Sequence, residues 1–139
     1  MAQDRITLTV PSRPEYAKTV RMTAAAIVSR TSLPYDEVDD IRIAAEELFV
    51  YACDHSPHEG EVEVEFLIDE SNVQIRATLG DAARVADEDA ERRAAYATFI
   101  LGAVCDHFEM SSDDRGTHLT VIKNLPEDQG ATESNDGEG

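Results

Sequence analysis

The segment Asp39–His55, which reads DDIRIAAEELFVYACDH, decides the fold because its apolar residues recur at helical spacing. Acidic residues at 36 and 37 suit the first turn of this helix, and a Leu-Pro pair at 33–34 interrupts the chain before it. Pro57 then ends it. The apolar stripe comprises Val38, Ile41, Ala45, Leu48, Phe49 and Ala52. The sequence therefore predicts an amphipathic helix from Asp36 to about His55, with one face in the core.

The residues on either side of this helix alternate between the period of a strand and that of a helix. The predicted strands are Arg5–Val10, Glu61–Ile68, Asn72–Leu79 and Thr117–Leu125, and further helices are predicted at about Pro14–Arg30 and Glu88–Phe108. A polar connection at 70–72 joins the middle two strands as a hairpin. This order predicts an α+β two-layer sandwich: a mixed or antiparallel sheet with about three helices packed on one face.

Charge and length narrow the possible functions. The chain has 139 residues, with 12 Lys and Arg against 29 Asp and Glu, giving a formal net charge of −17. This balance argues against direct binding to nucleic acid or to an anionic membrane, and it would attract a basic partner. Residues 126–139 contain five acids, no Lys or Arg and no large apolar side chain, so we expect a disordered acidic tail after one domain at 1–125.

Several common signals are missing from the sequence. It contains no P-loop, no G-x-G-x-x-G and no CxxC pair. Asp54, His55, His58 and Glu59 resemble a metal cluster, but Pro57 breaks the helix between the histidines, so a solvated helix end is favoured and no metal is expected. No basic-then-apolar leader opens the chain, and no apolar run approaches the roughly 20 residues of a membrane span. We therefore expect a cytoplasmic protein.

Two motifs in the predicted elements resemble the RsbW/SpoIIAB family of anti-sigma factor serine kinases, which have a GHKL (Bergerat) ATPase-type fold. The family helix reads roughly D-x-x-(I/L)-A-(V/A)-x-E-A-x-x-N-A, and its last strand reads G-T-x-(V/L)-x-(M/I)-x-K. The helix motif is matched by Asp40, Ile43, Ala44, Ala45, Glu47 and Ala52, and the strand motif by Gly116, Thr117, Leu119, Val121 and Lys123. The order of elements agrees over residues 5–125.

The resemblance assigns roles to two positions on the central helix. The family's candidate general base for phosphoryl transfer falls on Glu47, for which the alternative is a surface acid beside Glu46. The family's asparagine ligand for Mg²⁺ falls on Tyr51. A phenol cannot replace a compact carbonyl ligand for a hard cation, so this position departs from the family pattern.

The remaining nucleotide-binding motifs of the family are also altered in this sequence. The family's D-x-G-x-G stretch reads LGDAA at 79–83, where Asp81 is a shifted remnant, and two lid glycines fall on Ala95 and Ala97. Alanines favour continuing the helix through this region, and the neighbouring acids at 87, 88, 89 and 91 repel polyphosphate. Gly116 and Thr117 are then mainly a strand-entry turn. These departures predict a degenerate nucleotide site without a cofactor, and ATP and Mg²⁺ are expected only if the kinase is active.

The resemblance also implies protein partners. In the family, a homodimer holds an RNA polymerase sigma factor, and an anti-anti-sigma protein of the STAS type displaces it, in stress responses or development. The family's partner-contact arginine falls on Arg21, which forms a basic cluster with Arg13 and Lys18; the alternative is a solvated helix charge. The first strand is the expected dimer contact.

We therefore expect an anti-sigma factor with weak or lost ATP binding. The first alternative is an active serine kinase of the STAS partner, and the second is a partner-switching scaffold that binds no sigma factor.

Overall fold

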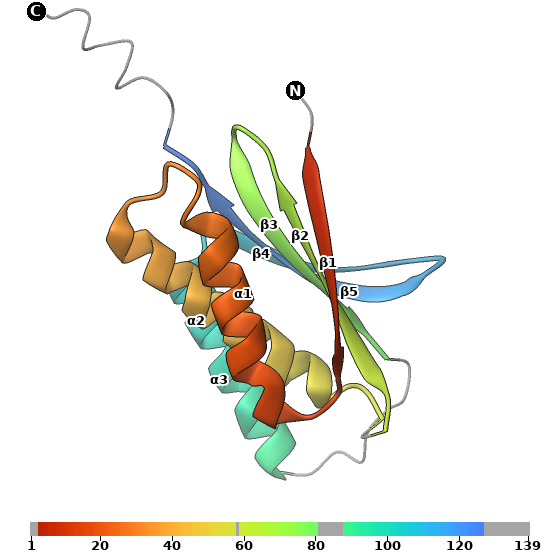
Figure 1. Cartoon of the computed structure of the whole chain (residues 1–139). Helices are drawn as coiled ribbons and strands as arrows, with labels where there is room; N and C mark the ends of the chain where they lie inside the picture. Colours follow the sequence, from red (N-terminus) through yellow and green to blue (C-terminus); the bar gives the residue numbers. More distant parts are fainter. Residues whose placement is uncertain (1–2, 58, 81–87, 127–139) are drawn as a thin grey trace, which may run out of the picture.

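The chain folds as one antiparallel sheet with all of its α-helices on one face, as seen in a computed structural model of residues 3–57, 59–80 and 88–126 (Figure 1). The elements are β1 (Asp4–Pro11), a short 3₁₀ turn η1 (Pro14–Tyr16), α1 (Ala17–Val28), α2 (Tyr35–Cys53), β2 (Glu61–Ile68), β3 (Asn72–Leu79), α3 (Glu88–Val104), β4 (His107–Asp113) and β5 (Gly116–Asn124). The strand order is β1-β2-β3-β5-β4, and every neighbouring pair is antiparallel. This confirms the predicted α+β two-layer class.

The core lies between the sheet and the helices, as the two periods predict. Alternate residues of β2 and β3, such as Phe66 and Ile75, face the helices and are fully buried. Leu48 and Phe49 of α2 are also fully buried, and α2 lies between α1 and α3 in Figure 1. The stripe that defines α2 therefore supplies the centre of the helical layer.

The C-terminal third differs from the sequence prediction. The helix predicted to run to Phe108 ends at Val104, and the unpredicted strand β4 follows from His107. Its sequence, HFEMSSD, is mostly polar and almost wholly exposed, because β4 is an edge strand. Backbone pairing with β5 defines the strand, and Phe108 contacts the core opposite Val121. A strand held by long-range pairing at an edge has no strong local signal.

Lys123 is a buried cation that joins three elements. Its Nζ donates to the Val104 carbonyl oxygen at the end of α3 (3.2 Å) and lies 3.5 Å from carboxylate oxygens of both Glu37 and Asp40 on α2. Burial acts to lower the pKa of Lys123, but Glu37, Asp106 and Asp40 outweigh it, so the pKa is raised. Lys123 is therefore buried as a cation that is paired with acidic groups.

Three sequence expectations fall wholly or partly outside this description. Asp81 and residues 127–139 of the predicted tail lie outside the described residues, as does His58 of the metal-like cluster. Among the residues that are described, no group of His, Cys, Asp or Glu is arranged to hold a metal ion. None of the helices in this part of the chain is long and apolar enough to cross a membrane.

Candidate functional site

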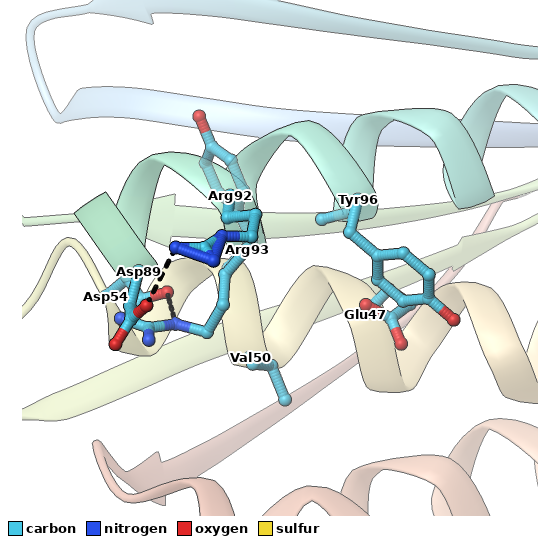
Figure 2. A pocket seen from close by; sticks show the side chains of 9 residues that line it. Glu47, Val50, Asp54, Asp89, Arg92, Arg93 and Tyr96 are labelled. Carbon is cyan, nitrogen blue, oxygen red and sulfur yellow. Dashed lines mark hydrogen bonds and ion pairs between the residues drawn. The ribbon is translucent and has the colours of Figure 1, made fainter.

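A pocket of about 470 Å³ opens between the C-terminal half of α2 and the N-terminal half of α3 (Figure 2). Its α2 wall includes both positions that the family motif singles out. The lining residues are Glu47, Val50 and Tyr51 from α2, Asp54 at the C-cap of α2, and Asp89, Arg92, Arg93, Tyr96 and Ala97 from α3. Two helices far apart in the sequence therefore build a cavity large enough for a small ligand or a partner side chain.

The pocket arginines are engaged by acidic partners. Arg93 Nε and Nη2 donate to the two carboxylate oxygens of Asp54, at 3.0 and 2.9 Å, so this pair joins α3 to α2 in a bidentate contact (Figure 2). Arg92 Nη2 lies 3.2 Å from Asp89 within the first turns of α3. A phosphate would therefore share or compete for guanidinium groups that already have carboxylate partners.

Glu47 is the central acid of the pocket. Its side chain is half-buried, and burial raises its pKa, with a smaller contribution from the neighbouring charge of Glu46. Glu46 itself accepts a hydrogen bond from Arg21 Nη1 at 2.9 Å. Glu47 is therefore a half-buried residue of the pocket lining with a raised pKa, and its role as a general base stays a prediction.

Tyr51 lies one helical turn after Glu47 and also lines the pocket. Its ring stacks on the imidazole of His55, with ring centroids 4.5 Å apart and an interplanar angle of 20°. Burial raises the pKa of its phenol. A phenol stacked on His55, at the position that the resemblance gives to the Mg²⁺ ligand, lacks the compact carbonyl oxygen that a hard cation prefers.

The two alanines at the lid-glycine positions lie within α3. Ala97 is buried in the pocket wall, whereas Ala95 is exposed. The helix continues through both residues, as their propensity predicts. Asp81, the remnant of the preceding motif, lies outside the described residues.

Gly116 and Thr117 are the first two residues of β5. Gly116 has a φ of +126°, a conformation that L side chains rarely adopt, where the two-residue turn from β4 ends. Thr117 Oγ1 lies 3.1 Å from Ser112 Oγ across the hairpin. Within the described part of the chain, neither residue is among those that line the α2–α3 pocket.

The three basic residues predicted to contact a partner lie on α1 or just before η1, and two of them have side-chain contacts within the fold. Arg21 is partly buried in its ion pair with Glu46, and so connects α1 to the residue next to Glu47. The Arg13 guanidinium contacts the ring and hydroxyl of Tyr16, whose hydrogen bond raises the pKa of Arg13. Lys18 is exposed.

Sequence analysis missed Val50 and Tyr96 as pocket residues. Both are apolar or aromatic residues within predicted helices, and such residues are more typical of core packing than of a binding site. The Asp54–Arg93 pair joins residues that are 39 positions apart, so the sequence around either residue does not indicate the contact. The spacing of Arg92, Arg93 and Tyr96 on α3 indicates a common helical face only once the helix is known to begin before them.

The five-stranded antiparallel sheet with helices on one face defines an α+β protein of GHKL-like fold. Comparison with known proteins identifies its family. The profile of the Histidine kinase-like ATPase domain matches residues 10–136, and the chain belongs to this family.

Within the family, the chain is of the RsbW type. It is similar to the serine-protein kinase RsbW of Halalkalibacterium halodurans, with 28% identity over 143 aligned positions, covering 91% of this chain and 86% of that protein. It is 35% identical over 75 residues to RsbW of Bacillus subtilis (52% of this chain, 47% of that protein), and 33% identical over 78 residues to RsbW of Listeria monocytogenes serovar 1/2a (54% and 50%). The chain spans about half the length of these last two relatives.

Proposed function

We propose that this protein is an anti-sigma factor that sequesters an RNA polymerase sigma subunit and is released by a STAS-type anti-anti-sigma partner, with ATP binding weak or lost. The α2–α3 pocket supports this proposal: it contains Glu47 and Tyr51, the positions that the family resemblance gives to the nucleotide site, and its arginines are already paired with Asp54 and Asp89. Sequestration requires affinity for the sigma factor and needs no phosphoryl transfer. The family assignment supports the regulatory role.

Three features on separate positions support the loss of ATP binding. Tyr51 replaces a carbonyl ligand, Ala95 and Ala97 continue α3 where the family carries glycines, and the Asp54–Arg93 pair neutralises the cation nearest to α2. Each feature removes a different element of nucleotide recognition: the metal ligand, the backbone cradle and the phosphate charge partner. Restoring one alone is therefore not expected to restore binding.

An active serine kinase is the second candidate, and Glu47 favours it. Its raised pKa and position in a pocket are typical of a general base, and the relatives carry the name serine-protein kinase. In this alternative, Glu47 would take the proton from the hydroxyl of the partner's serine. The distinction between the two candidates lies in whether Mg²⁺ and ATP bind.

The partner-binding surface is proposed on α1, with Arg21 as its central contact and Lys18 beside it. The family resemblance supports this role, and the partial exposure of the Arg21 side chain at the α1–α2 surface is compatible with it; a partner carboxylate would have to compete with Glu46 for the guanidinium. We further propose a homodimer through β1, an edge strand whose Thr7 and Thr9 are exposed, and a cytoplasmic location, where sigma factors act.

Titration with a fluorescent ATP analogue and Mg²⁺ tests the proposal. The wild-type protein is expected to show no saturable, Mg²⁺-dependent binding in the micromolar range. The variant Tyr51→Asn/Ala95→Gly/Ala97→Gly, which restores the family residues, is the matched comparison and is expected to bind more tightly than wild type. Micromolar binding by the wild type would establish the kinase alternative.

Capture of the tagged protein from its native cells tests the partner. A sigma factor is expected among the bound proteins. Recovery of STAS-domain proteins alone would contradict the anti-sigma assignment and favour a scaffold.

A further inference from the structure

The charge left in the pocket is negative. Asp54 pairs with Arg93 and Asp89 with Arg92, whereas Glu47 has neither an ion pair nor a side-chain hydrogen bond within the described residues. Its half-buried carboxylate is poorly solvated, consistent with its raised pKa. A cation entering the pocket would therefore gain a carboxylate partner without displacing an existing pair.

Two aromatic rings line the same pocket as this carboxylate. Tyr51 and Tyr96 both line the pocket, and in Figure 2 the Tyr96 ring projects toward the side where Glu47 lies. Tyr96 is 58% exposed, so its ring is available to a ligand. A planar guanidinium stacks on aromatic faces and bonds a carboxylate through several N–H groups, whereas an ammonium is a compact, strongly hydrated charge.

Large apolar side chains are exposed on the same two helices that build the pocket. Phe99, one turn beyond Tyr96 on α3, is 71% exposed, and Ile43, one turn before Glu47 on α2, is 42% exposed. Large apolar side chains beside a pocket that accepts one anchoring residue are typical of a protein interface. The chain's net charge of −17 favours a basic partner over long range.

We propose that the α2–α3 pocket receives an arginine side chain of a basic partner protein, which pairs with Glu47 and stacks between Tyr51 and Tyr96, while flanking apolar residues of that protein cover Phe99 and Ile43. This inference rests on the proposed function in one respect: the pocket must be free of nucleotide. It assigns the former nucleotide position to partner recognition, on a different helix pair from the Arg21 surface.

The test uses blocked tripeptides and the full-length, isotopically labelled protein. Acetyl-Leu-Arg-Leu-amide is titrated while amide chemical shifts are followed by NMR, and the citrulline analogue serves as the neutral control of the same shape. Saturable shifts are expected around Glu47 on α2 and Tyr96 on α3. Binding of the citrulline peptide should be at least about tenfold weaker, the factor that one charge-assisted contact provides.

Variants identify the anchoring carboxylate. Glu47→Gln is expected to lower the affinity for the arginine peptide by at least about tenfold. Glu91→Gln, an exposed residue of α3 outside the pocket lining, changes the net charge equally and should alter affinity less than about twofold, because exposed charges are strongly screened. The bound peptide should also lower the pKa of Glu47, measured from its side-chain carboxyl shift.

Several outcomes would overturn the inference. These are equal binding of the citrulline peptide, unchanged affinity of Glu47→Gln, shifts confined to other elements, or a lysine peptide that binds as tightly as the arginine peptide. Self-association that covers the same amides without peptide would identify a second copy as the occupant instead. Nucleotide binding in the parallel ATP titration would refute the proposed loss of ATP binding whatever the peptide does, so the two failures are distinguishable.

Discussion

Replacing Lys123 by methionine is expected to lower the free energy of unfolding by about 2 kcal/mol, because Lys123 joins α2, α3 and β5 through one buried ammonium group. Methionine keeps most of the apolar stem and removes the ammonium group, with its charge and its hydrogen-bond donors. The hydrogen bond from Nζ to the Val104 carbonyl oxygen is charge-assisted and contributes about 1.5 kcal/mol or slightly more.

The two carboxylate contacts of Lys123 contribute less than this hydrogen bond. The side chains of Glu37 and Asp40 are 37% and 35% exposed, and each lies 3.5 Å from Nζ. Solvent screens such pairs to a few tenths of a kcal/mol each. Since water can solvate both carboxylates after the substitution, the loss should stay below the 3–5 kcal/mol range of fully buried pairs.

Thermal and urea unfolding, followed by circular dichroism, measure this effect. A loss of about 2 kcal/mol corresponds to a decrease in Tm of about 8 °C for a domain of this size. The matched control is Lys18→Met, which removes the other lysine of the chain from an exposed position and should change stability by less than about 0.5 kcal/mol. Equal stabilities of the two variants would refute the account of Lys123 as a structural cation.

The pH dependence of the free energy of unfolding provides a second test of the role of Lys123. Its pKa is raised in the folded state, so its stabilisation is fully present below the unfolded pKa of about 10.4 and is lost as pH rises through the folded value. The stability difference between wild type and Lys123→Met should therefore be constant from pH 7 to pH 9 and shrink at more alkaline pH. A difference that grows with alkaline pH would contradict the assigned direction.

Three further predictions concern other parts of the molecule. Gly80→Ala should lower stability by about 1–3 kcal/mol in urea unfolding, because its Cβ would lie 2.6 Å from the His55 carbonyl oxygen; Gly102→Ala, whose Cβ would meet only Phe108 at 3.6 Å, should be neutral or stabilising. Burial raises the pKa of the Cys105 thiol to about 12, so iodoacetamide at pH 8 should modify Cys105 far more slowly in the native protein than in urea, as followed by mass spectrometry; equal rates would contradict this. Arg21→Glu should weaken binding to the captured sigma factor, measured by calorimetry, while circular dichroism remains unchanged; unchanged affinity would show that Arg21 is not the partner contact.

Local patterns predicted most of the fold because they follow from backbone periodicity. The α2 stripe and the alternation in β2 and β3 identify a buried face without any knowledge of the partner element. The same reasoning failed at β4, where HFEMSSD carries little apolar alternation and the strand depends on pairing with β5. It also extended α3 too far, because Val104 and Cys105 suit either a helix or a loop that contacts the core.

The candidate site likewise has features that follow from local sequence and features that depend on tertiary packing. The sequence by itself placed Glu47 and Tyr51 one turn apart on a helix and located the alanines at 95 and 97, because these positions depend only on spacing along the chain. Only the tertiary structure decided that Asp54 pairs with Arg93, that Glu46 pairs with Arg21, and that Glu47 lines the same pocket as Tyr96. Such pairs depend on how α1, α2 and α3 pack on the sheet, and packing brings together residues whose separation in sequence gives no signal of contact.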